Sequence, residues 1–150
     1  MSKIIIRPIK LSDTKKIEEL IKQLYQPVDQ KSVIKSIQHH LDNDDYEIIL
    51  ATSSMDEVIG FISIHSTILI HREKPMARIT AIIVDVNHRF LGVGKKLMNY
   101  AEAWAIKKGC NIIELTTGIF RKNSGVDIFY DKLDYKNTGD NQKIYLRKYI

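Results

Sequence analysis

Hydrophobic and polar positions along this chain follow two different periods. Apolar side chains recur at helical spacing in residues 17–24, 33–41, 93–104 and 126–133. Strand-length runs rich in β-branched and apolar residues occupy residues 3–7, 46–52, 57–65, 78–86, 111–117 and 143–148. The predicted order is therefore β-α-α-β-β-β-α-β-α-β, and residues 135–137 indicate one further short strand.

The connections between these elements predict a mixed sheet. A short polar turn at residues 53–56 joins two strands as a hairpin, which makes them antiparallel. Two strand–helix–strand passages near the end of the chain require parallel neighbours. The run 78–86 is almost continuously apolar, as is typical of a strand covered on both faces. The fold class is thus α/β (α+β), with helices packed on a mixed sheet.

Length and composition narrow the function classes. The chain has 150 residues, 44% of them hydrophobic, and a net charge of +5. A chain of this size buries roughly 70% of its unfolded surface, so residues 1–150 are expected to form a single domain. Its one cysteine, Cys110, excludes an intramolecular disulfide framework and a Cys-based zinc site. Apolar stretches stay well below the ~18 residues of a membrane helix, which favours a soluble, cytoplasmic protein without a membrane partner.

A glycine-containing segment between the strand at 78–86 and the next helix carries the clearest chemistry. Residues 85–97 read Asp-Val-Asn-His-Arg-Phe-Leu-Gly-Val-Gly-Lys-Lys-Leu. Gly92 and Gly94 let a ligand approach the backbone, and the free amides and dipole of a helix N-terminus favour an anion. Arg89 and Lys95 add positive charge. The segment therefore predicts a site for a phosphate-bearing ligand.

Two common phosphate-binding patterns do not fit this segment. A P-loop needs glycine where Arg89 stands and a hydroxyl residue where Lys96 stands. A dinucleotide-binding loop needs a small residue where Leu97 stands. An NTPase and a nicotinamide-dependent enzyme are both disfavoured.

The pattern that does fit is Arg-x-x-Gly-x-Gly at residues 89–94, and it resembles the pyrophosphate loop of the GCN5-related N-acetyltransferases. Residues 123–135 resemble a second motif of that family, Asn-x-x-Ala-x-x-aromatic-Tyr-x-x-x-Gly-Phe. Val126 stands in place of the small residue, and Asp134-Tyr135 replace Gly-Phe. Because Asp tolerates a left-handed backbone, we expect the turn at Asp134 to be kept.

This resemblance implies an acetyl-CoA-dependent N-acetyltransferase that needs no metal. Its fold is a mixed, mostly antiparallel central sheet of six to seven strands, with about four helices on both faces. The parallel strands at 78–86 and 111–117 would splay to hold the pantetheine arm, and an amine would attack directly in a ternary complex. The residues implied to bind the coenzyme are Ile83, Val84, Val86, Arg89, Phe90, Leu91, Gly92, Val93, Gly94, Lys95, Asn123 and Tyr130.

The catalytic roles are less evenly supported. Tyr130 matches the family's general acid, and its alternative role is a core aromatic beside Phe129. Asn123 matches a coenzyme contact and would also suit a helix N-cap. Many relatives carry a carboxylate on the strand before the loop, but residues 79–82 have none. Glu114, in an apolar strand, is the candidate base, with a structural ion pair to a neighbouring strand as the alternative.

The acceptor is expected to be a primary amine of a small molecule, and a homodimer stays open. A coenzyme A-binding sensor or a catalytically degenerate protein is the alternative function. A nucleic-acid-binding module is disfavoured, because the aromatic–basic interleaving of an RNA-binding sheet is missing. His39 and His40 are expected to be a solvated helix end, whereas His65 and His71 flank a loop that could line an acceptor pocket.

Overall fold

A computed structural model describes residues 3–24, 28–118, 125–139 and 142–150 of this chain. The chain divides into two compact units, Met1–Leu115 and Thr116–Ile150, and each is described by itself. The predicted site residue Asn123 lies outside the described residues.

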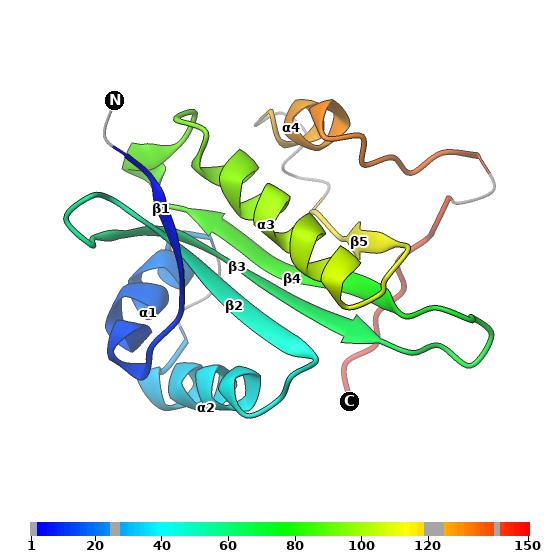
Figure 1. Cartoon of the computed structure of the whole chain (residues 1–150), viewed down its shortest axis with the longest axis horizontal. Coiled ribbons are helices and arrows are strands. Elements are labelled where there is room, and N and C mark those ends of the chain that lie inside the picture. The colour runs from blue at the N-terminus through cyan, green and yellow to red at the C-terminus, as the bar shows by residue number, and fades with distance from the viewer. Residues whose placement is uncertain (1–2, 25–27, 119–124, 140–141) are drawn as a thin grey trace. The chain divides into compact units, whose positions relative to one another are not determined.

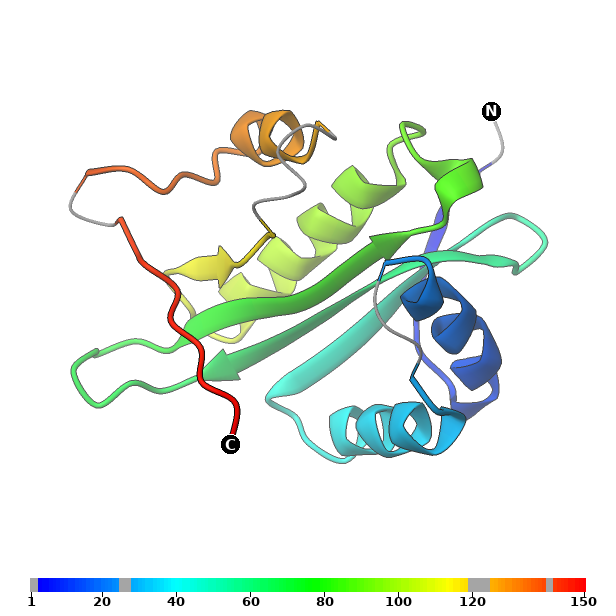
Figure 2. The same ribbon diagram turned by 180° about the vertical axis from the view of Figure 1, so that it is seen from behind.

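The first unit is a five-stranded sheet with helices on both faces (Figure 1, Figure 2). The strand order is β1-β2-β3-β4-β5, in which the first four strands are antiparallel and β4 and β5 are parallel. This arrangement confirms the predicted mixed, mostly antiparallel sheet. In chain order the elements are β1 (Ile5–Pro8), a 3-10 turn (Leu11–Asp13), α1 (Thr14–Lys22), α2 (Gln30–Leu41), β2 (Tyr46–Thr52), β3 (Val58–Thr67), β4 (Met76–Val84), a second 3-10 turn (Val86–His88), α3 (Val93–Lys107) and β5 (Ile113–Leu115).

Helices α1 and α2 lie on one face of this sheet and α3 lies on the other (Figure 1, Figure 2). The apolar stripe that predicted the third helix is its buried face, with Leu97 and Ala101 fully enclosed. On the opposite face, Leu50 and Phe61 of the sheet belong to the core that packs against α1 and α2. Within the described ranges, no helix is long and apolar enough to cross a membrane.

Strands β3 and β4 approach each other closely at Gly60. A Cβ at this position would lie 2.8 Å from the carbonyl oxygen of Ile83 and 3.3 Å from Cγ1 of Val93. Real Cβ atoms do not approach a backbone oxygen this closely, so only glycine fits. The contact fixes the end of β4 against the first residue of α3.

Two predicted strands end earlier than the sequence pattern indicated. The run at 78–86 gives a strand that stops at Val84, because Asp85 caps the following 3-10 turn. The run at 111–117 gives only Ile113–Leu115, which is the part that pairs with β4. β5 therefore ends where the parallel pairing ends, at Leu115 opposite Ile79, whereas β4 continues without β5 as far as Val84.

The second unit contains α4 (Val126–Lys132), which follows Gly125 in a left-handed conformation (φ +80°). The Tyr130 ring contacts the rings of Phe129 and Tyr135, at centroid distances of 5.1 and 6.2 Å. Asp134 adopts φ +64°, as expected for the turn in which it replaces glycine.

The strands predicted at residues 143–148 and 135–137 are wrong, because the described residues of this unit contain no strand. Ile144 and Leu146 are 87% and 86% exposed, so burial does not favour an extended pairing there. The sheet therefore has five strands among the described residues instead of six to seven.

Candidate functional site

The second half of β4 presents an unpaired backbone edge. β5 pairs only with Ala77–Ile79, so residues 80–84 have no strand partner on that side in the described part of the first unit. The Asp85 N–H donates to the Ile59 carbonyl (2.9 Å), and the alternation of an antiparallel pair then turns the backbone groups of Ile83 toward β3. The backbone N–H and C=O groups of Val84 and Ile82 point away from β3, toward the free edge. An extended ligand can bind such an edge as an added strand would.

A capped turn carries the chain from β4 to α3. Oδ1 of Asp85 accepts a hydrogen bond from the Asn87 N–H (2.9 Å), and Oδ2 accepts one from Nε2 of Gln23 (2.9 Å). Burial acts to raise the pKa of Asp85, but hydrogen bonds from Gln23, Asn87 and His88 bring it below its ordinary value. Gln23 Oε1 also accepts the Val86 N–H (3.0 Å), so this amide is not free for a ligand.

The loop between the turn and α3 exposes its backbone to open space. Phe90 and Gly92 both adopt left-handed conformations, with φ of +62° and +84°. A Cβ at Gly92 would meet no atom within 4 Å, and the side chains of Phe90 and Leu91 are exposed. Nε of Arg89 donates to the Val84 carbonyl (3.2 Å), which ties the guanidinium to the end of β4.

Helix α3 begins directly after Gly92. The Lys96 N–H donates to the Gly92 carbonyl (3.1 Å) as the first intrahelical bond. The N–H groups of Val93, Gly94 and Lys95 therefore precede any intrahelical acceptor. These amides, the helix dipole and the side chains of Lys95 and Lys96 give this helix end the features that favour an anion, and the binding of a phosphate here stays a prediction.

A hydrogen-bonded group of three side chains lies beside the free edge, and we call Thr80, Ser63 and His40 the polar triad. The pairing of β3 with β4 shifts between Ser63 and Ile64, which leaves Thr80 as an extra residue in a β-bulge. Oγ1 of Thr80 donates to Oγ of Ser63 (2.9 Å), and that oxygen lies 3.0 Å from Nε2 of His40. Thr80 is exposed, Ser63 is buried and His40 is half-buried. The expectation of a solvated helix end is wrong for His40, although His39 is exposed.

Sequence reasoning did not connect the members of the polar triad. The available signals were Ser63 as a polar residue inside an apolar strand and the two adjacent histidines at the end of a helix. Neither signal identifies the other as its partner, because the contacts span 23 and 17 residues of sequence.

Glu114 forms the inter-strand ion pair that was the alternative to a role as base. Nη1 of Arg78 donates to Oε1 of Glu114 (2.9 Å) across the paired part of β4 and β5. Both side chains are about a third exposed, at 32% and 35%. His65 is the β3 partner of Arg78 and stacks on Tyr46, with ring centroids 5.3 Å apart.

Tyr130 lies on α4 of the second unit, whereas the loop and the free edge belong to the first. Its expected role as general acid stays a prediction. Across the described ranges, no group of three His, Cys, Asp or Glu side chains could hold a metal ion.

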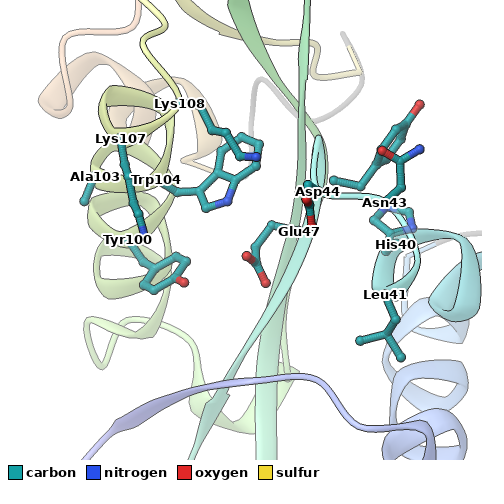
Figure 3. A pocket seen from close by; sticks show the side chains of 11 residues that line it. His40, Leu41, Asn43, Asp44, Glu47, Tyr100, Ala103, Trp104, Lys107 and Lys108 are labelled. Atoms are coloured by element: carbon teal, nitrogen blue, oxygen red, sulfur yellow. The ribbon is translucent and has the colours of Figure 1, made fainter.

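A cavity of about 580 Å³ lies near the far end of α3 from the glycine loop (Figure 3). Ala103 in its wall stands eleven residues beyond Gly92, which is roughly 16 Å along the helix. Figure 3 shows Glu47 on the side of α3, with Tyr100 and Trp104, and His40 on the side of α2. Burial raises the pKa of Glu47. This cavity is separate from the loop, but His40 borders it.

Comparison with known proteins connects these features to a family. The profile of the acetyltransferase (GNAT) family matches residues 14–135. The chain belongs to this family. An uncharacterized N-acetyltransferase of Methanocaldococcus jannaschii is 34% identical over 79 residues, which cover 52% of this chain and 34% of that protein. The match thus spans about a third of that relative's length.

Solved acetyltransferase structures share the GNAT fold with this chain. Glucosamine-6-phosphate N-acetyltransferase from Arabidopsis thaliana is 22% identical, with a TM-score of 0.80 over 98% of each chain. AAC(6')-Iy, in complex with the bisubstrate analog CoA-S-monomethyl-acetylneamine, is 21% identical, with a TM-score of 0.81 over 99% of this chain and 100% of that one. The family resemblance predicted from residues 89–94 and 123–135 is confirmed.

Proposed function

We propose that this GNAT protein is an N-acetyltransferase that moves an acetyl group from acetyl-CoA to a primary amine of a small molecule. The observation that carries the proposal is the continuity of the free β4 edge with the Arg89–Gly94 loop and the start of α3. An edge suits the amides of a pantetheine arm, and the loop suits a diphosphate. One extended ligand with both groups would bind along this path.

Different residues along the β4 edge and the loop would bind different parts of acetyl-CoA. The outward backbone groups of Ile82 and the N–H of Val84 would pair with the pantetheine arm, whereas the Val84 carbonyl already accepts a hydrogen bond from Arg89. The first amides of α3, at Val93 and Gly94, would donate to the diphosphate, and Lys95 would add charge. Gly92 would let the phosphate oxygens approach the backbone, since a Cβ there would stand in open space.

The proposed reaction is direct transfer in a ternary complex. The amine nitrogen attacks the thioester carbonyl carbon, and a backbone N–H of the β4 edge would stabilise the oxygen as it becomes negative. The carbon–sulfur bond then breaks, and the departing thiolate takes a proton from the Tyr130 phenol. Tyr130 belongs to the second unit, so this role also requires that both units form one acetyltransferase domain.

The acceptor class rests on what similar proteins are named for or were solved with. AAC(6')-Iy was solved with an acetylneamine bisubstrate analog, and the Arabidopsis thaliana protein is named for an amino sugar phosphate. Both names describe small primary amines, and this supports the same class here. A cytoplasmic location and a homodimer remain part of the proposal.

The test begins with thermal unfolding of the protein in the presence of acetyl-CoA, ATP or NAD. A ligand at about 100 times its Kd stabilises by ~2.7 kcal/mol. At this length that is a rise in Tm of roughly 5–11 °C. A rise with acetyl-CoA alone is expected. Equal shifts with all three ligands would reduce the loop to a general anion site.

Turnover is then measured as thiol release from acetyl-CoA with neamine, glucosamine 6-phosphate, spermidine and a lysine-containing peptide. Turnover with one of the first three amines is expected. The alternative function, a coenzyme A-binding sensor, is favoured by the ion pair that occupies Glu114. Binding of acetyl-CoA without turnover of any of the four amines would support that alternative.

A further inference from the structure

The acetyl transfer proposed above needs a group that takes a proton from the attacking amine. Residues 79–82 of β4 carry no carboxylate, and Glu114 is held by Arg78. Asp85 is likewise committed, as the cap of the turn that follows β4. The polar triad is the remaining polar path that reaches the free edge in the described part of the first unit.

We propose that the polar triad removes the amine proton, with Thr80 facing the acceptor and His40 as the final proton acceptor. This inference rests on the proposed acetyltransferase function and names the proton path of that reaction. The polar triad begins at the bulge where β5 pairing has just ended at Ile79, which is where the free edge starts. Thr80 is exposed there, so an amine or a bridging water can reach its hydroxyl.

The hydrogen bonds of His40 fix the direction of transfer. Nδ1 lies 2.7 Å from the Ser36 carbonyl oxygen, which can only accept, so Nδ1 carries the ring proton. In the neutral ring, Nε2 then presents its lone pair to the Ser63 hydroxyl. Ser63 donates to His40, and Thr80 donates to Ser63. Both hydroxyls can therefore donate away from the free edge and toward the histidine, with the Ser63 carbonyl oxygen, 3.3 Å from Oγ1 of Thr80, as a second acceptor for the Thr80 proton.

The proton balance follows from this order. As the amine nitrogen forms its bond to the carbonyl carbon, its proton passes to Oγ1 of Thr80. The Thr80 proton passes to Oγ of Ser63, and the Ser63 proton passes to Nε2 of His40. The amine nitrogen has lost one proton and the imidazole has become imidazolium, while both hydroxyls are restored. After the product leaves, the proton returns from Nε2 through the hydroxyls of Ser63 and Thr80 to solvent at the free edge, because the Ser36 carbonyl oxygen keeps the proton of Nδ1.

The surroundings keep His40 neutral before the reaction. Burial lowers its pKa below the ordinary value, against a hydrogen bond from the ring to Ser36 that raises it. The titratable rings that face it are His39 on α2, Tyr46 on β2 and His65 on β3. The cavity that His40 borders is also lined by four charged groups, of which Glu47, Lys107 and Lys108 lie on the side of α3; the fourth is Asp44.

The test compares variants that break the polar triad with variants that keep it. Thr80→Val, Ser63→Ala and His40→Gln each interrupt the path, whereas Thr80→Ser keeps a hydroxyl. His39→Gln is the matched control, since His39 adjoins His40 but is exposed and lies outside the polar triad. The reaction is acetyl-CoA with whichever of the four amines named above turns over fastest.

We expect kcat to fall on the order of 10²- to 10³-fold in the three interrupting variants, with the Kd for acetyl-CoA unchanged. Thr80→Ser should retain more activity than Thr80→Val because it keeps a hydroxyl, and His39→Gln should stay near wild type. The double variant of Ser63 and His40 should be no slower than either single one, because both break one path. In wild type, kcat/KM should fall as the pH drops through the pKa of His40, which burial holds below the ordinary histidine value, and His40→Gln should lack this acid limb.

Two results overturn the proposal, and they differ from each other. Turnover with the same kcat and the same acid limb in His40→Gln and wild type would refute the polar triad alone. Acetyl-CoA binding without turnover of any of the four amines would refute the proposed function, and the role of the polar triad with it.

Discussion

Gly92 and Gly109 flank α3 and provide a matched pair of substitutions. Their φ angles are +84° and +78°, and a Cβ would meet no atom within 4 Å at either position. Alanine at either position therefore adds left-handed strain without a clash, which costs about 1–2 kcal/mol. For a chain of this length the loss lowers Tm by roughly 2–8 °C. The two variants should be destabilised alike.

Only Gly92 adjoins the proposed diphosphate site, so only Gly92→Ala should weaken acetyl-CoA. A methyl group between the loop backbone and the diphosphate should lower the affinity at least tenfold, or by ~1.4 kcal/mol. A ligand concentration that stabilises wild type by ~2.7 kcal/mol would then stabilise Gly92→Ala by only ~1.4 kcal/mol. Thermal unfolding of the three proteins with and without acetyl-CoA measures both effects. Equal ligand-induced shifts in the two variants would refute the assignment of the loop.

Three further substitutions examine the fold and the role proposed for Tyr130 as general acid. Gly60→Ala should lose about 1–3 kcal/mol, because its Cβ would press on the Ile83 carbonyl, and chemical denaturation measures the loss. Asp13→Asn should lose about 1.5–3 kcal/mol at pH 7, since the charge and one of the two oxygens that accept hydrogen bonds from Arg7 are removed. Arg7 lowers the pKa of Asp13, so the wild-type advantage exists above the unfolded pKa of about 3.9 and disappears as pH falls through the lower folded value. Melting curves of both proteins between pH 7 and pH 2 follow this convergence, and a constant difference would contradict it. Tyr130→Phe should reduce kcat on the order of 10²-fold while the Kd for acetyl-CoA stays constant, and unchanged turnover would assign Tyr130 to packing.

The parts of the fold that could be predicted depend on local signals. The stripe from Val93 to Trp104 repeats at helical spacing, so it marks α3 without knowledge of any partner. The loop before α3 could also be predicted from local sequence, because Gly92 and Gly94 stand between a predicted strand and a predicted helix. The left-handed turn at Asp134 was also local, since it follows from the backbone that Asp tolerates.

The strand boundaries could not be predicted in the same way, because a strand exists only with its partner. Residues 111–117 and 143–148 have similar apolar patterns, yet the first gives three paired residues and the second gives no strand. Ile113–Leu115 face Ala77–Ile79 across the sheet, whereas Ile144 and Leu146 are exposed. An apolar pattern indicates that a segment can form a strand, but how many of its residues do so depends on the strand edge available for pairing.

The bulge at Thr80 shows why the polar triad could not be predicted from the sequence. Side chains alternate between the two faces of a strand, so a shift of one residue moves a side chain to the other face. With regular alternation through Ile79 and Ala81, the Thr80 side chain would lie on the face of the sheet opposite to Ser63, whereas as the extra residue of the bulge it lies beside Ser63. The same irregularity lies next to the last residue that β5 pairs, so the free edge and the exposed hydroxyl begin at one point. A single inserted residue in β4 thus brings together the coenzyme path and the proton path of the proposed reaction.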